Sequence, residues 1–168
     1  QRIPVKESQV VTLFDTGSNI NLVTEDCVSR CHLSIAPRSL EVDIPGSTLI
    51  TNKMCLVPLV DREGTIQLIQ AAVVETISKK VNSYPNHQAI RVFGRNKTGF
   101  DEIQGEDIDV LIGLSNQSIF PREIRRKNGS YLYSSIFSTG NVAAGNGRTW
   151  SVDSKAELMG KRCYLVKA

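Results

Sequence analysis

The chain has 168 residues and a mass of 18.5 kDa, which suits one domain of ordinary size and is too short for two. Its 40% hydrophobic and 22% charged residues are typical of a soluble globular protein, and no run of about 18 apolar residues could cross a bilayer. A formal net charge of +3 is too small to indicate nucleic-acid binding. We therefore expect a single domain over residues 1–168, with no membrane or nucleic-acid partner. The densest basic cluster is expected to be a solvated turn rather than a phosphate contact: Arg122, Arg125, Arg126 and Lys127.

The cysteines indicate a reducing compartment and no metal site. Four are too few for a disulfide scaffold in a chain of this length, and no charged and apolar leader precedes Gln1, so we expect an intracellular protein, cytoplasmic or nuclear. Cys27, Cys31 and His32 are spaced as metal ligands could be, but a zinc site needs four ligands and His87 lies in a different kind of segment. We interpret these thiols as buried helix residues and expect no cofactor.

The first half of the chain favours strands with one short helix. Residues 10–14 and 20–23 are β-favouring runs around a tight turn at 15–19. Thr24 can cap a helix that ends before Pro37, with acidic residues in its first turn and basic residues in its last. Alternation then predicts a hairpin over about 40–50 with its tip at Pro45-Gly46-Ser47. A second hairpin follows over 56–77, turning at 61–64.

The second half begins with a polar excursion over about 79–106, which we expect to be a long, partly ordered insertion with strand character only at 90–93. A buried strand is predicted at 108–114, and Ser115 can begin a brief helix. Residues 131–137 and 142–144 predict another hairpin. The tail from about 150 to 168 is unplaced, with weak strand signals at 149–152 and 163–166.

Two segments together point to chemistry. Asp15-Thr16-Gly17-Ser18 directly follows the apolar run 10–14, and the apolar run Val110-Leu111-Ile112-Gly113 lies about a hundred residues downstream. The first resembles the catalytic loop of aspartic proteases, and the second resembles the strand that packs under that loop in retropepsins. With the long insertion and the late stretch at 135–145, these elements resemble the Pao (BEL/Pao) retrotransposon peptidase family over roughly residues 10 to 145. Ser115 and the turn at 138–141 depart from the usual family pattern.

This resemblance implies an all-β fold, a retropepsin-like closed barrel with one or two short helices, and a peptidase that acts as a homodimer. Peptide hydrolysis by this route needs two close carboxylates that share one proton, because like charges so near cannot both ionise. The ionised partner activates water, and the protonated partner donates to the scissile carbonyl. This chain has a single D-T-G, so the second aspartate is expected from another copy of Asp15.

The resemblance also implies the roles of the loop residues. Gly17 permits a tight turn where a β-carbon would intrude between two loops. Thr16 would hydrogen-bond to the partner loop, and Ser18 would donate to the outer oxygen of Asp15. The alternative for Asp15 is an Asx-turn residue in a hairpin. Asp107 and Asp109 are further acids, of which Asp109 is expected to be a structural hydrogen-bonding group rather than a second catalytic acid.

The hairpin tip formed by Ile44, Pro45, Gly46 and Ser47 falls where retropepsins carry the flap that closes over the substrate. Its alternative is an ordinary hairpin of the sheet. Two functions follow. The first is an aspartic endopeptidase, retrotransposon-derived, that hydrolyses extended segments of a protein or polyprotein. The second is a domesticated, inactive retropepsin fold that serves as a dimerisation or protein-binding module. An intact Asp15-Thr16-Gly17-Ser18 favours the enzyme.

Overall fold

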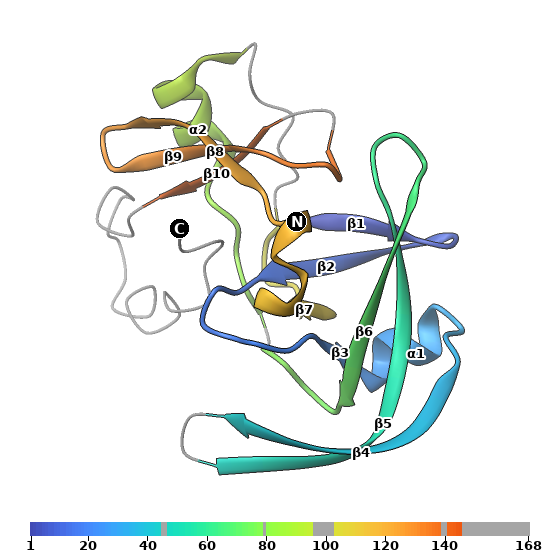
Figure 1. The fold of residues 1–168 in the computed structure, drawn as a ribbon. Coiled ribbons are helices and arrows are strands. Elements are labelled where there is room, and N and C mark those ends of the chain that lie inside the picture. Colours follow the sequence, from blue (N-terminus) through green and yellow to red (C-terminus); the bar gives the residue numbers. More distant parts are fainter. Residues whose placement is uncertain (45–46, 79, 96–102, 139–140, 146–168) are drawn as a thin grey trace.

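The structure is a computed structural model that describes residues 1–44, 47–78, 80–95, 103–138 and 141–145. Strands are the main secondary structure of these residues, and the helices are short (Figure 1), so the predicted all-β class is confirmed. The strands are β1 (Arg2–Val5), β2 (Ser8–Phe14), β3 (Leu22–Thr24), β4 (Ile35–Ile44), β5 (Ser47–Val60), β6 (Ile66–Val74), β7 (Val110–Ile112), β8 (Arg122–Lys127), β9 (Ser130–Ser134) and β10 (Asn141–Gly145). The helices are α1 (Glu25–Arg30), α2 (Asn86–Phe93) and the 3₁₀ segment η2 (Leu114–Ile119).

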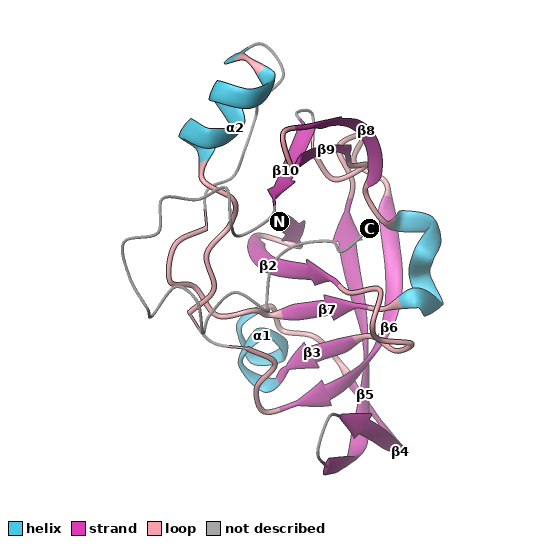
Figure 2. Cartoon of the chain, turned by 90° about the vertical axis from the view of Figure 1, so that its left-hand side faces the viewer, coloured by secondary structure: helices cyan, strands magenta, loops and turns pink. Residues whose placement is uncertain are grey.

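Six of the strands close into a barrel in the order β1-β2-β7-β3-β6-β5, and a contact between Val5 and Leu59 joins β1 to β5. Pairs along the barrel are antiparallel except β2–β7 and β3–β6, which are parallel. Strand β4 extends from the barrel as the outer arm of the β4–β5 hairpin (Figures 1 and 2). The closed barrel agrees with the predicted all-β barrel architecture.

Strand β7 lies between β2 and β3 although it comes about a hundred residues later in the sequence. Thr12 to Phe14 pair in parallel with Val110 to Ile112, while Leu22 and Val23 pair with Leu111 and Val110 in antiparallel register. All three β7 residues are buried. This burial explains the unbroken apolar sequence, because a strand flanked on both edges and covered on both faces needs no polar side.

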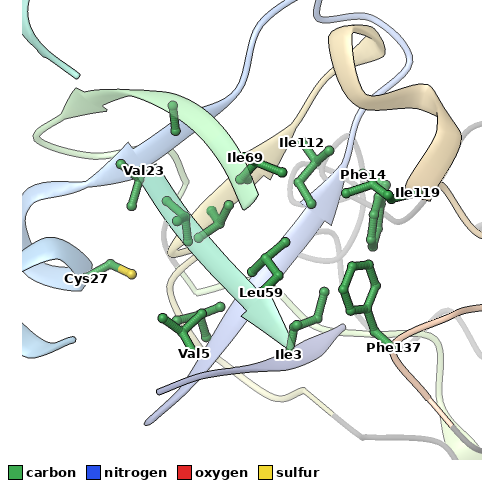
Figure 3. Packing of buried hydrophobic residues seen from close by; sticks show 14 of the residues in the cluster. Ile3, Val5, Phe14, Val23, Cys27, Leu59, Ile69, Ile112, Ile119 and Phe137 are labelled. Atoms are coloured by element: carbon green, nitrogen blue, oxygen red, sulfur yellow. The ribbon is translucent and has the colours of Figure 1, made fainter. Parts of the chain in front are cut away.

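The barrel interior is filled by side chains that alternate along each strand. Phe14, Val23, Leu59, Ile69 and Ile112 converge there (Figure 3), each with at most 4% of its surface exposed. Phe14 also contacts two aromatic rings from the C-terminal half, with its ring centroid 5.4 Å from that of Phe120 and 6.3 Å from that of Phe137. The residue immediately before Asp15 is therefore anchored in the core.

The short helix α1 begins as predicted and ends at Arg30, well before Pro37, so that His32, expected in its last turn, lies beyond it with a φ of 50°. Thr24 is its N-cap and accepts a hydrogen bond from the Cys27 N–H at 3.2 Å. Cys27 and Cys31 are buried against the barrel, as expected for helix thiols, and Cys55 on β5 is also a buried free thiol. Burial, followed by the neighbouring Cys31, raises the pKa of the Cys27 thiol, which keeps it protonated and unreactive.

The predicted hairpins are present, and two of them share one strand. β5 pairs with β4 along its first half and with β6 along its second, so one 14-residue strand belongs to both hairpins. A register shift interrupts the β4–β5 ladder between Pro37 and Leu40. The predicted hairpin in the C-terminal half is the β9–β10 pair.

Within the insertion, the segment from Tyr84 to Phe93 packs on the C-terminal sheet, whose strand order is β10-β9-β8 (Figure 1). Tyr84, Ala89 and Phe93 form a second apolar cluster with Leu132 and Ala143. The predicted strand at 90–93 is wrong, because these residues belong to α2. The buried positions Ala89 and Phe93 are four residues apart, which is the spacing of one helix face.

The prediction that the basic cluster forms a turn is wrong, because all four of its cations lie in strand β8. The prediction that the cluster is solvated is confirmed, because every β8 residue is exposed. β8 forms by pairing with β9, and its own sequence has no apolar alternation that would signal a strand. The sequence analysis predicted no strand at residues 2–5, where the structure has β1. The tail predictions at 149–152 and 163–166 lie outside the described residues.

Candidate active site

Asp15 begins the loop that leaves the end of β2. Its N–H donates to the carbonyl of Ile112 on β7 at 2.9 Å, and its own carbonyl accepts from the Ser18 N–H at 3.3 Å. The Gly17 N–H donates to Asp15 Oδ1 at 2.9 Å. Asp15 is partly exposed, while Thr16 and Gly17 are exposed. One carboxylate is thus held by a backbone donor at the surface of the barrel.

The loop is not the tip of a hairpin. The bond from the Gly17 N–H to Asp15 Oδ1 is the bond of an Asx-turn. The alternative interpretation of Asp15, however, placed that turn in a hairpin, between two strands that pair with each other. Here β2 and β3 each pair with β7, which separates them. The Asx-turn of this alternative is therefore present, but its hairpin is not, and the loop spans the end of an inserted strand.

Gly113 supports the loop from below, as predicted for the segment 110–113. A β-carbon at this position would lie 2.4 Å from the Ile20 carbonyl oxygen and 2.7 Å from that of Ser18. The next two residues of β7's continuation bond to the same loop: the Leu114 N–H donates to the Ser18 carbonyl at 2.8 Å, and the Ser115 N–H donates to the Asn19 carbonyl at 3.3 Å. Residues 112–115 consequently fix the loop at its start, at Asp15, and towards its end, at Ser18 and Asn19.

Ser18 forms a different bond from the one the resemblance implied. Its hydroxyl donates to the Ile20 carbonyl at 2.9 Å and accepts from the Ile20 N–H at 3.3 Å. A hydroxyl has a single hydrogen, so it is not donated to Asp15. In this subunit Ser18 stiffens the loop, and the Gly17 N–H is the group that holds the Asp15 carboxylate.

Asp109 is the structural acid that the sequence predicted. Only 8% of it is exposed, and its carboxylate accepts from the Val11 N–H at 2.8 Å and from the Arg30 guanidinium at 2.7 Å. Burial alone would lower the pKa of Arg30, but its bond and attraction to Asp109 raise it. Asp109 precedes β7 and Asp15 contacts the other end of that strand, so the two acids are separated by its length. Asp107 is exposed and accepts from the Lys80 N–H at 3.0 Å.

The proposed flap is the end of the β4–β5 hairpin. Ile44 pairs with Ser47, and Pro45 and Gly46 lie outside the described residues. In Figure 1 the end of this hairpin and the loop after β2 both lie on the left of the barrel. The register of the hairpin therefore agrees with the predicted tip, while its role as a flap stays a prediction.

Sequence reasoning missed a small apolar cluster and a buried amide next to the loop. Met54 and Ala72 are buried together, with Ile20 and Leu22 packed against them. Asn21, between those two apolar residues, is only 4% exposed. A polar residue at the start of an otherwise apolar strand was the available signal for it.

Two further findings concern metals and membranes. Among the residues that the structure describes, no group of three or more His, Cys, Asp or Glu side chains could hold a metal ion. Within the same ranges, no helix has the length and apolar character needed to cross a membrane.

Comparisons with protein-family models, with curated proteins and with solved structures found no match to this chain. The resemblance to the Pao peptidases accordingly rests on the motifs quoted above.

Proposed function

We propose that this chain is one subunit of a homodimeric aspartic endopeptidase of the retropepsin type, related to the Pao retrotransposon peptidases. The observation that supports this most is the position of Asp15, in a loop laid across the end of β7, where β7 separates β2 from β3. A surface carboxylate supported by backbone bonds along 112–115 is pre-oriented, which acid–base chemistry requires.

The dimer follows from the number of carboxylates. The chain contains one D-T-G, and the nearest acid along β7, Asp109, is committed to Val11 and Arg30 at the other end of the strand. Thr16 and Gly17 are exposed, so a second loop has access to them. Two-fold pairing of identical loops is the simplest way to complete a two-carboxylate site.

In this dimer Asp15 and the partner's Asp15 share one proton. The ionised carboxylate removes a proton from water as the water attacks the scissile carbonyl, and the protonated one donates to the carbonyl oxygen. The bond from Gly17 to Oδ1 orients the carboxylate, and the missing β-carbon of Gly17 leaves room for the facing loop. The β4–β5 hairpin closes over an extended peptide and excludes water.

The test compares the wild type with Asp15→Asn, which keeps the size of the side chain and its acceptor for the Gly17 N–H. We expect cleavage of a diverse peptide library at mildly acidic pH to fall by about 100-fold to 10,000-fold or more. Asp107→Asn is the matched control, because Asp107 is also a surface aspartate that accepts a backbone N–H. It should cleave as the wild type does.

Light scattering at micromolar concentration establishes the assembly of each variant. Equal cleavage by the wild type and Asp15→Asn would exclude Asp15 as the catalytic acid. A wild-type dimer that cleaves nothing would instead support the binding-module function. A strictly monomeric wild type with no activity would count against both the dimer and the protease.

A further inference from the structure

The side chain of Asn21 uses all of its hydrogen-bonding groups in the interior. Nδ2 donates to the Gln70 carbonyl at 2.8 Å and to Asn116 Oδ1 at 2.7 Å. Oδ1 accepts from the Gly113 N–H at 3.0 Å. Three separate segments, on β6, on η2 and at the end of β7, therefore meet at one carboxamide.

The bond to Gly113 completes the support of the Asp15 loop. Along residues 112–115, one carbonyl and two N–H groups bond to the backbone of the loop at Asp15, Ser18 and Asn19. The Gly113 N–H lies in the middle of this series and has the Asn21 side chain as its partner. A β-carbon at Gly113 would lie less than 3 Å from two carbonyl oxygens of the loop, so the position of Gly113 determines the height of the loop above β7.

Only an amide suits this site. A carboxylate at position 21 would place an oxygen against two acceptors, the Gln70 carbonyl and Asn116 Oδ1. An apolar side chain would leave the buried Gly113 N–H without an acceptor, at a cost of about 1–3 kcal/mol. Asn116 reaches Asn21 from a kink within η2, where its φ of −119° and ψ of 37° depart from helical values.

We infer that Asn21 is a positioning residue: through Gly113 it holds the Asp15 carboxylate at the height and orientation needed to face the partner's Asp15. This inference rests on the proposed function. Asn21 does not touch the reacting atoms, and it acts by fixing the backbone beneath them. A displacement of about 1 Å at such a site costs on the order of 100-fold in rate.

The experiment compares two variants that make the same chemical change on the two sides of one hydrogen bond. Asn21→Asp removes the donor, whereas Asn116→Asp keeps the acceptor and adds the same charge at a partly exposed position. For Asn21→Asp we expect kcat to fall about 10-fold to 100-fold with KM within about two-fold of wild type. Asn116→Asp should keep both values.

Two measurements are independent of cleavage. Hydrogen exchange at the Gly113 N–H should accelerate about 100-fold in Asn21→Asp while exchange at the barrel residues Val57 and Leu59 stays at the wild-type rate. The carboxyl carbon of Asp15 should show a changed ¹³C shift in Asn21→Asp and the wild-type shift in Asn116→Asp. A purely structural role would accelerate exchange at all these sites together and leave kcat per folded molecule unchanged.

Each outcome decides the inference. Equal losses in the two variants would show an effect of charge, and unchanged Gly113 and Asp15 signals in Asn21→Asp would remove the positioning role. If Asn21→Asp does not fold, Asn116→Ala replaces it, with several-fold faster Gly113 exchange expected and wild-type exchange overturning the inference. An inactive wild type refutes the proposed function alone, because the exchange and ¹³C measurements still test Asn21.

Discussion

Replacing Gly113 by alanine should destabilise the protein strongly, although the backbone there suits any residue. With φ −96° and ψ −176° the conformation is extended, so the cost is steric. The added β-carbon would lie 2.4 Å, 2.7 Å and 2.9 Å from three atoms, all of them backbone atoms of Ser18 and Ile20. Since backbone cannot rotate away as a flexible side chain can, the loop and β7 have to separate by about 0.5 Å or more.

The magnitude follows from what that separation breaks. Overpacking costs about 1–3 kcal/mol. The bonds from Leu114 to Ser18 and from Gly113 to Asn21, now 2.8 Å and 3.0 Å, would lengthen and lose about 1 kcal/mol each. A total of about 3–5 kcal/mol is a large part of the 5–15 kcal/mol that holds a typical domain folded.

Urea unfolding followed by circular dichroism measures this effect. With a slope of about 2 kcal/mol per molar urea, the midpoint of Gly113→Ala should fall by about 2 M. Gly17→Ala, unfolded at a concentration at which the chain is monomeric, is the control in the same loop: within one subunit its β-carbon meets only the Asp15 side chain, at 3.2 Å, and its φ is not in the left-handed region. That variant should lose less than about 1 kcal/mol. Midpoints within about 0.3 M of each other for the two variants would refute the reasoning.

Two further predictions concern carboxylates away from the loop. Arg30→Met should lower the free energy of unfolding by about 1–3 kcal/mol in urea titrations, because the mostly buried Asp109 loses its cation. The control is Asp26→Asn, which removes the exposed ion pair between Asp26 and Arg30 and should change the free energy of unfolding by less than about 0.5 kcal/mol. Equal losses in the two variants would contradict this reasoning. Burial alone would raise the pKa of Asp61, but bonds from Gln67 and from the Thr65 and Glu63 N–H groups lower it. A lowered pKa contributes stability above the unfolded-state value that is lost as the pH falls through the folded-state value, so Asp61→Asn should flatten the decline in melting temperature below about pH 4. An unchanged pH profile would show that these bonds do not favour the charged form.

The sequence predicted those elements whose signals are local. Thr24 predicted the start of α1, and the turn residues after Ile44 predicted where the β4–β5 hairpin ends, since Ile44 pairs with Ser47. A polar strand such as β8 depends on a partner strand, and an apolar run such as 90–93 fits either a strand or a helix until its contacts are known.

In the candidate site, too, local sequence signals predicted some features and missed those that depend on contacts between distant segments. Asp15 and Gly17 were identified by a motif, and the strand that contains 110–112 was identified by its apolar sequence, while the resemblance to retropepsins gave its expected position under the loop. The bonds that the Ser18 and Asn21 side chains make could not be predicted, because they depend on which backbone groups the fold brings within about 3 Å. Hydrogen-bond partners at a buried position are a property of the assembled structure.

The insertion of β7 between β2 and β3 also orders events during synthesis. β2 and β3 are complete once residue 24 has been made, yet the edges that face each other in the barrel stay unpaired until residues 110–112 arrive. At ordinary rates of translation that interval is on the order of 5 to 20 seconds. Throughout it, the nascent chain presents two open strand edges, so closure of the barrel is a late event with high contact order. The Asp15 loop is synthesised before the strands β4 to β7, and it is among the last parts of the barrel to reach its final shape.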